Sequence, residues 1–329
     1  MKSNFFNKFY KNIFLDKYDN EYINFNYNIF NKPKLNKKVL LSELDWRESD
    51  IIGSSFLIDR ILRKYKAELA CFSPNLTTGF FNWLKKIFFK FTNRKIYKIN
   101  KSLGVNTFIF PTLSKKQKKT SSEIFLSIKK KIKNKRDVIN FSFDKIYYGD
   151  LLYDFHLRKY NIPTIDFKSN LIFEDLEYFI KLVIYWKDFV KVNKNKMCGL
   201  LIGHCCYNHG ILQRICLFNN IKTYEASTEY IFAHTKKNFH TFKDWDHSFL
   251  EINKFNKDKK KKLVKIGKKI LKKRFEGKND RNSSFMIWAT KYQTYNKKKY
   301  KNIFEKNNKK RFVVFAHCFF DNPNVFGKN

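Results

Sequence analysis

Short apolar runs alternate with longer amphipathic segments along most of this chain, and that alternation limits its fold more than any other feature. Apolar residues in 50–64, for example, recur at the spacing of one helix face, after the apolar run at 37–42. The runs that we interpret as strands are residues 37–42, 69–73, 107–111, 198–203 and 222–226. Repeated strand–helix order is typical of a parallel sheet with helices on both faces. The sequence therefore predicts an α/β fold with a Rossmann-like parallel sheet.

Composition divides the chain into four parts. Residues 1–36 are rich in Asn, Lys, Phe and Tyr without a clear period, and they predict a polar N-terminal leader. Residues 37–290 predict one domain, which includes a Lys-rich, solvated surface helix over 257–273. Residues 291–310 are polar and predict a linker, and 311–329 begin with a new apolar strand. Because a single central strand cannot bury both its faces, we expect 311–329 to start a second, truncated Rossmann-like domain.

The chain of 329 residues is strongly basic, with 68 Lys and Arg against 29 Asp and Glu and a formal net charge of +39. Such a charge attracts nucleic acid or an anionic membrane surface. Only ten of the basic residues are Arg, however, and no helix-turn-helix, RNA-recognition or zinc-finger pattern occurs. We therefore expect no specific nucleic-acid partner, and nonspecific binding of nucleic acid stays an alternative explanation of the charge.

No apolar run approaches the ~18 residues that span a bilayer, and Asn and Lys interrupt every apolar stretch near the N-terminus. These features predict a cytoplasmic protein, either free or peripheral at the inner membrane face. Residues 80–91 place aromatic side chains on one helical stripe with lysines beside it. That pattern fits a helix lying on anionic lipid and, equally, an amphipathic helix packed on its own sheet.

Six cysteines, two of them adjacent, form no disulfide pattern in a chain of this length, so we expect reduced thiols. His204, Cys205, Cys206 and His209 lie close together in sequence, which raises the question of a metal site. Their spacing matches no usual zinc pattern, and adjacent cysteines do not easily reach one tetrahedral ion. P-loop, GxGxxG, HExxH and GxSxG patterns do not occur either. We therefore predict no bound metal and no cofactor.

Residues 203–214, GHCCYNHGILQR, follow an apolar strand and open an amphipathic helix. A helix that starts after a parallel strand offers backbone N–H groups and the positive end of its dipole to a phosphate or carboxylate. His204, Tyr207 and His209 would lie at that rim, although His204 could equally be a structural histidine and His209 a helix cap. Arg214 suits bidentate contact with phosphate, and pairing with an acidic residue is the alternative.

A second polar segment, residues 149–158, reads GDLLYDFHLR and predicts a helix. Asp150 and Asp154 are four residues apart and therefore share one helix face. Either carboxylate could act as a general base, and Asp150 could instead cap the helix N-terminus. Arg158 extends the polar side of this helix, and spacing alone assigns it no role.

These two segments, together with three others, resemble a family of bacterial surface carbohydrate or capsule polysaccharide biosynthesis proteins. The resemblance runs from about residue 37 onward and depends on the order and spacing of short motifs more than on any one of them. The motifs are GDLLYDFHLR at 149–158, GHCCYNHGILQR at 203–214, ASTEY at 226–230, LKKRFEGKND at 271–280 and VVFAHCFFDNPNVFG at 313–327. In that family the last motif has a histidine after the proline, where this chain has Asn324.

The family is similar to glycosyltransferases of the GT-B type, in which two Rossmann-like domains face each other across a cleft. The resemblance implies transfer of a sugar from a nucleotide-sugar donor to a glycan or lipid-linked acceptor. It implies no metal ion, because helix dipoles and basic side chains neutralise the leaving diphosphate. Residues 37–290 would be the acceptor-side domain, with Asp154 or His204 as the base. The substrate-binding residues that the resemblance implies are Asp150, Arg158, Tyr207, His209, Arg214, Glu229, His317 and Asp321.

One further class of function stays open besides nonspecific binding of nucleic acid. If the second domain is missing, the chain could be a non-catalytic fragment, a folded acceptor-side domain whose partner half is absent or belongs to another chain. A reading frame that continues downstream, or an adjacent one that encodes the rest, would favour the enzyme over the fragment.

Overall fold

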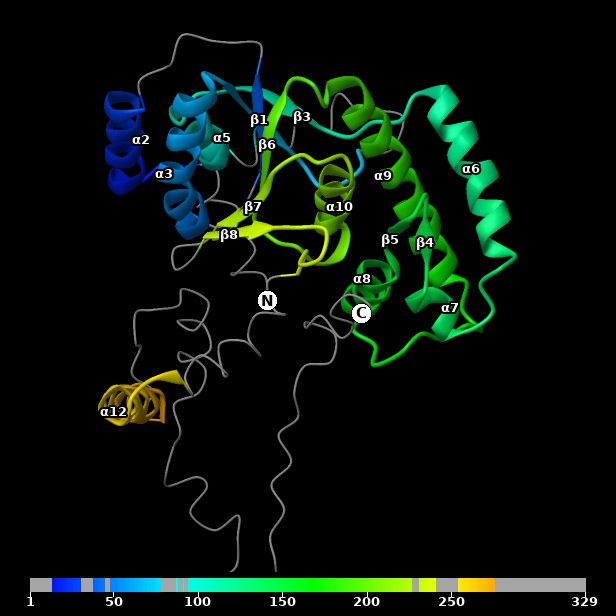
Figure 1. Ribbon diagram of the computed structural model, residues 1–329. Helices are drawn as coiled ribbons and strands as arrows, with labels where there is room; N and C mark the ends of the chain where they lie inside the picture. The colour runs from blue at the N-terminus through cyan, green and yellow to red at the C-terminus, as the bar shows by residue number, and fades with distance from the viewer. Residues whose placement is uncertain are drawn as a thin grey trace, which may run out of the picture. The chain divides into compact units, whose positions relative to one another are not determined.

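The computed structural model describes residues 14–30, 38–44, 48–77, 87, 91, 94–226, 231–240 and 254–275. These residues belong to two units, one within 14–240 and one within 254–275, and each is described by itself. The first is an α/β unit built on a six-stranded sheet (Figure 1). The second contains the predicted Lys-rich helix, α12 (Lys257–Phe275). The two units part between residues 240 and 254.

The sheet contains all five predicted strands and one more. Its strands are β1 (Val39–Glu43), β2 (Glu68–Phe72), β3 (Val105–Ile109), β6 (Met197–Ile202), β7 (Thr223–Ala226) and β8 (Ile231–His234). The first five run parallel, and β8 pairs antiparallel with β7. A connection of four residues joins β7 to β8, and only antiparallel neighbours can be joined by so short a link. The predicted α/β fold with a mostly parallel, Rossmann-like sheet is therefore confirmed.

The order of the strands is β3-β2-β1-β6-β7-β8. The strands β2 and β3 therefore lie on one side of β1, and the later strands β6, β7 and β8 lie on its other side. In register, Leu41 of β1 lies between Ala70 of β2 and Leu200 of β6. In open α/β sheets, the place where the strand order reverses leaves a crevice at the carboxyl ends of the two central strands. Here that switch point lies between β1 and β6.

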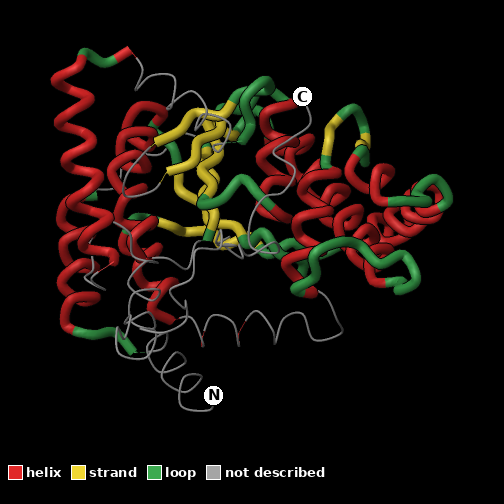
Figure 2. Tube along the Cα trace, turned by 90° about the horizontal axis from the view of Figure 1, so that it is seen from below, coloured by secondary structure: helices red, strands yellow, loops and turns green. Residues whose placement is uncertain are grey.

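Helices cover both faces of the sheet (Figures 1 and 2). Successive residues of a strand point to opposite faces, so Leu40 and Leu41 belong to two separate hydrophobic cores. The core around Leu40 includes α2 (Lys17–Ile29), α3 (Glu48–Tyr65) and α5 (Arg94–Ser102). The core around Leu41 includes α8 (Gly149–Tyr160), α9 (Leu171–Asn193) and α10 (Gly210–Phe218). Trp186 of α9 meets Phe72 of β2 edge to face, with ring centroids 5.3 Å apart.

A long crossover from β3 to β6 forms the helical part of the unit. Besides α8 and α9, it contains α6 (Lys115–Lys129), α7 (Lys135–Ile139) and a short hairpin of β4 (Ser142–Phe143) and β5 (Ile146–Tyr147). The start of α8 packs directly on the end of α7. Gly149 makes this possible, because a Cβ there would overlap the carbonyl group of Ile139. The polar segment 149–158 is therefore a helix, as predicted, and it is fixed within the domain.

The predicted leader contains α2, which packs against α5. Asp16 and Asp19 cap its N-terminus reciprocally, and the ammonium group of Lys95 lies 2.7 Å from Asp19 Oδ1. The side-chain amide of Asn26, also buried, donates to Ser102 Oγ at 2.9 Å. Because the buried face of α2 holds Asp19 and Asn26 beside Ile23, its apolar residues show no clear period in the sequence.

Several predicted features lie outside the described residues. These are most of the aromatic stripe at 80–91, the linker at 291–310, the strand and second domain at 311–329, and three substrate-binding candidates, Glu229, His317 and Asp321. Among the helices that the structure does describe, none combines the length and the apolar character that a bilayer crossing requires.

Candidate functional site

The switch point holds a carboxylate that the sequence analysis did not select. Glu43 is the last residue of β1, and its side chain is only 4% exposed. Its Oε2 accepts a hydrogen bond of 3.0 Å from the backbone N–H of Gly203, the first residue after β6. Glu43 therefore joins the carboxyl ends of the two central strands. The sequence did contain a signal for Glu43, which is an acidic residue at the end of an apolar run and shortly before a helix.

The other carboxylate oxygen of Glu43 contacts Nδ1 of His209. His209 ends the short helix η1 (Tyr207–His209) and directly precedes α10. Its side chain is 28% exposed, whereas that of Glu43 is buried. A carboxylate at Nδ1 favours the tautomer with the proton on Nδ1, so that Nε2 is the basic nitrogen. The pair is therefore chemically suited to take up a proton at the rim of the crevice.

Three more of the predicted residues surround His209. The ring centroid of His204 lies 6.2 Å from that of His209 and 5.7 Å from that of Tyr207. The guanidinium carbon of Arg158, an exposed residue of α8, lies 4.6 Å from the Tyr207 ring centroid. Tyr207 itself has a φ of 56°, a left-handed conformation that few residues other than glycine adopt. Ring contacts therefore link His204, Tyr207 and Arg158 to one another and to His209, while the Tyr207 side chain itself is buried, with 4% of its surface exposed.

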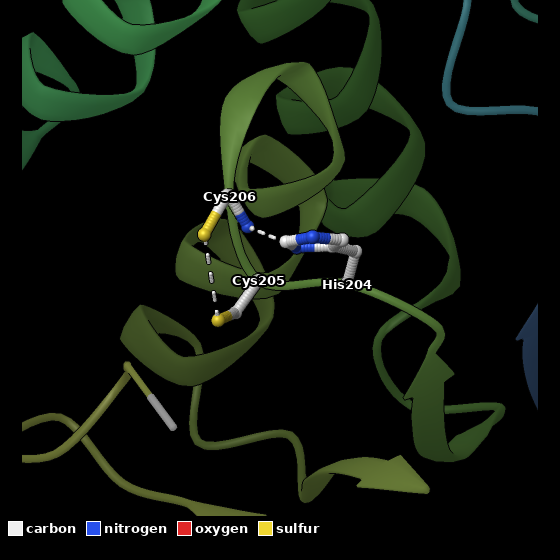
Figure 3. Close-up of side chains that lie close together, drawn as sticks. All are labelled: His204, Cys205 and Cys206. Carbon is white, nitrogen blue, oxygen red and sulfur yellow. Dashed lines mark hydrogen bonds between the residues drawn. The ribbon is translucent and has the colours of Figure 1, made fainter. Parts of the chain in front are cut away.

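The loop between β6 and η1 is held tightly under these residues. Nδ1 of His204 accepts a hydrogen bond of 3.2 Å from the backbone N–H of Cys206 (Figure 3). Gly210 starts α10 so close to this loop that a Cβ would come within 2.5 Å of the carbonyl oxygen of Cys205. On the α3 side, a pocket partly lined by Ser42, Ser54 and Asn100 borders Glu43. The rim is thus polar on both sides of the switch point.

Asp150 and Arg214 lie elsewhere, in a buried ion pair. Two guanidinium nitrogens of Arg214 donate to the Asp150 carboxylate at 2.6 and 2.5 Å, and one of them also donates to the carbonyl of Tyr147 at 2.6 Å. Burial alone would lower the pKa of Arg214, but the charge of Asp150 raises it overall. Arg214 therefore pairs with an acidic residue inside the domain, which was the alternative to contact with phosphate. The N-cap position of α8 is Tyr148, and Asp150 lies in the first turn, where its Oδ1 accepts a hydrogen bond of 2.8 Å from the backbone N–H of Leu151.

Asp154 is also buried, with 3% of its surface exposed. It faces the loop after β6, where the hydrogen bond between Cys205 and Cys206, burial, and the charges of Cys205, Glu225 and Asp154 raise the pKa of the Cys206 thiol. A general base must reach the proton that it removes. Asp154 thus lacks the exposure that His209 has.

His156 and Asp175 form a second histidine–carboxylate pair between α8 and α9. Nδ1 of His156 lies 2.7 Å from Asp175 Oδ2, and both side chains are fully buried. Lys159 donates to the other oxygen of Asp175 at 2.6 Å. Burial alone would lower the pKa of Lys159, but the hydrogen bond and charge of Asp175 raise it overall. This group joins two helices in the interior of the domain.

Comparisons of the chain with protein-family profiles, with curated protein sequences and with solved structures gave no match. The sequence motifs and the geometry of the switch point are therefore the features that indicate its function.

Proposed function

We propose that this chain is the acceptor-side domain of a GT-B-like glycosyltransferase of surface or capsular polysaccharide biosynthesis. It would transfer a sugar from a nucleotide-sugar donor to a glycan or lipid-linked acceptor. The observation that carries the proposal is the pair of Glu43 and His209 at the switch point of a Rossmann-like sheet. In such sheets, ligands bind outside the carboxyl ends of the strands, and this is where the pair lies.

His209 is the general base in this proposal. Nε2 takes the proton of the acceptor hydroxyl while the hydroxyl oxygen attacks the anomeric carbon of the donor sugar. A new carbon–oxygen bond forms, the bond from the anomeric carbon to the phosphate oxygen breaks, and the nucleoside diphosphate leaves with that electron pair. Glu43 holds the imidazole in place and stabilises the imidazolium that forms. His209 replaces Asp154 and His204 as the preferred base, because Asp154 is buried and His204 is not paired with Glu43.

Arg158 at the rim binds substrate. Arg158 is an exposed cation beside Tyr207 and is suited to a diphosphate or an anionic acceptor. As the resemblance implies for GT-B enzymes, helix N-termini and basic side chains neutralise the leaving diphosphate. The net charge of +39 suits work beside an anionic, inner membrane surface that carries lipid-linked glycans.

Turnover by purified protein tests this proposal. The chain is incubated with a panel of nucleotide sugars and glycan or lipid-linked acceptors, and release of nucleoside diphosphate is measured. We expect Glu43→Gln and His209→Asn each to lower the rate by about 10²–10⁴-fold, because each removes part of the general base. Asp59→Asn is the matched control, since Asp59 pairs with Arg63 on the surface of α3. Full turnover in both site variants would refute the base assignment, and no binding of any nucleotide sugar or acceptor would refute the function.

A further inference from the structure

Two cysteines lie close to two histidines at and beneath the rim. Cys205 and Cys206 follow β6, and their sulfur atoms lie 4.0 Å apart (Figure 3). Nε2 of His240, which lies beyond β8 in the sequence, is 3.4 Å from the sulfur of Cys206. All three residues are at most 1% exposed. A ligand atom of His204 also lies within 4.8 Å of both sulfur atoms.

We propose that His204, Cys205 and Cys206 bind one divalent cation of the zinc type, with His240 beside Cys206 as the fourth donor. Zn–S bonds of about 2.3 Å and Zn–N bonds of about 2.0–2.1 Å place neighbouring ligands of a tetrahedral ion roughly 3.5–3.8 Å apart. The sulfur–sulfur distance of 4.0 Å and the sulfur–nitrogen distance of 3.4 Å are close to these values. The ligand atoms of His204, Cys205 and Cys206 all lie within 4.8 Å of one another, so side-chain rotation can bring them onto one ion.

The chemistry of the donors selects the class of metal. Thiolate sulfur and imidazole nitrogen favour Zn²⁺ over Mg²⁺ or Ca²⁺, which prefer oxygen ligands. Each cysteine that binds exchanges its S–H bond for a sulfur–metal bond and releases one proton to solvent. Two carboxylates, Asp154 and Glu225, also lie near Cys206, and their negative charge favours a cation there.

From the sequence we predicted no metal site here, because adjacent cysteines match no usual zinc pattern. One donor, His240, is 34 residues away from Cys206 in the sequence but beside it in the fold. The chain passes through β7 and β8 before His240 returns to the same loop. Within the loop, the left-handed conformation of Tyr207 follows directly after Cys206. The ligand set is thus assembled in three dimensions, and local spacing does not reveal it.

The site would be structural. Cys205, Cys206 and His240 are buried, whereas a catalytic metal site keeps an open position for water or substrate. The metal would link the loop after β6, which carries the rim residues, to the segment after β8. This inference does not depend on sugar transfer, so each can fail without the other.

Titration of the full chain with Co²⁺, as a spectroscopic substitute for Zn²⁺, tests the site. The protein is first reduced and treated with a chelator. We expect one equivalent of Co²⁺ to bind with a thiolate-to-cobalt charge-transfer band and the visible bands of a tetrahedral site, and Zn²⁺ to displace it. The double variant Cys205→Ser/Cys206→Ser should lose the charge-transfer band. Cys216→Ser is the control, since Cys216 is an equally buried thiol in α10.

Three outcomes would overturn the proposal: no charge-transfer band with excess Co²⁺, a band that persists in the double variant, or equal loss in Cys216→Ser. Because substitution of two buried residues can impair folding, a second measurement uses the unaltered chain. Thiol alkylation is followed by mass spectrometry in urea just sufficient for Cys205 and Cys206 to react. We expect Zn²⁺ to slow alkylation of these two residues but not of the half-buried Cys198. Equal rates with and without Zn²⁺ would also refute the site.

Discussion

Two histidine–carboxylate pairs in this domain have the same chemistry and different surroundings. In each, Nδ1 of the imidazole contacts a buried carboxylate. His156 and Asp175 are both fully buried between α8 and α9, whereas His209 is 28% exposed at the carboxyl ends of β1 and β6. The contact alone therefore does not distinguish a structural pair from a candidate general base. Position at the switch point and access to solvent distinguish them.

The same contrast separates most of α8 from the rim. In sequence, α8 was one of the two segments richest in candidate functional residues, yet Asp150, Asp154 and His156 all face the interior. Only Arg158 of that set reaches the rim, where it lies over the Tyr207 ring. We therefore expect substitutions inside α8 to affect stability, and substitutions at the rim to affect turnover.

The largest loss of stability should follow from Asp150→Ala. This change leaves the guanidinium of Arg214 buried without its carboxylate, and removal of one partner of a buried ion pair costs about 3–5 kcal/mol. Urea denaturation followed by circular dichroism measures the free energy of unfolding. The double variant Asp150→Leu/Arg214→Met is the control and should recover most of the loss, because it leaves no unpaired charge. A loss below about 1 kcal/mol in Asp150→Ala would contradict the assignment of a buried pair.

A smaller loss is expected for Asp175→Asn, which keeps the size of the side chain but removes its charge. His156 and Lys159 both contact this carboxylate, so we expect a decrease of about 1–3 kcal/mol in the free energy of unfolding. Turnover per folded molecule should stay unchanged, whereas Glu43→Gln should show the opposite pattern. If Asp175→Asn lowered turnover of the folded protein as strongly as Glu43→Gln, the proposed difference between the two pairs would be wrong.

The smallest effect on stability should come from Arg158→Ala. Arg158 is exposed, and its contact with the Tyr207 ring is worth less than about 1 kcal/mol. Under the proposed function, the KM for the nucleotide sugar should rise while the thermal unfolding temperature stays nearly constant. Arg158→Lys keeps the charge and should recover part of the affinity. An unchanged KM in Arg158→Ala would remove Arg158 from the binding site.

The sequence predicted the framework of the domain well. The central strands β1, β2 and β6 are buried and apolar on both faces, so they were visible as short apolar runs. The runs that predicted β3 and β7 are less apolar, and the middle of β3, at the edge of the sheet, is exposed. The helices α3, α8 and α12 were visible in the same way, through residues at helical spacing. Less visible was α2, because buried Asp19 and Asn26 form part of its packing face. The antiparallel β8 depends on its pairing with β7, which no local pattern specifies.

The candidate site was only partly predictable. His204, Tyr207, His209 and Arg158 were selected from their positions after a strand or along a helix, and the fold brings them together. Glu43 and His240 were not selected, since each matters through a partner that is distant in sequence. Arg214 and Asp150 were assigned to substrate, but they pair with each other in the interior.

By itself, then, the sequence determined the order of strands and helices, because burial imposes apolar periods that are local and readable. Tertiary structure alone decided which polar groups meet. The contacts that matter join residues 166 positions apart for Glu43 and His209, 64 for Asp150 and Arg214, and 34 for Cys206 and His240. Whether a carboxylate orients a base, neutralises a buried cation or favours a metal depends on that partner and on access to solvent. The partner and the access to solvent are both determined only when the chain has folded.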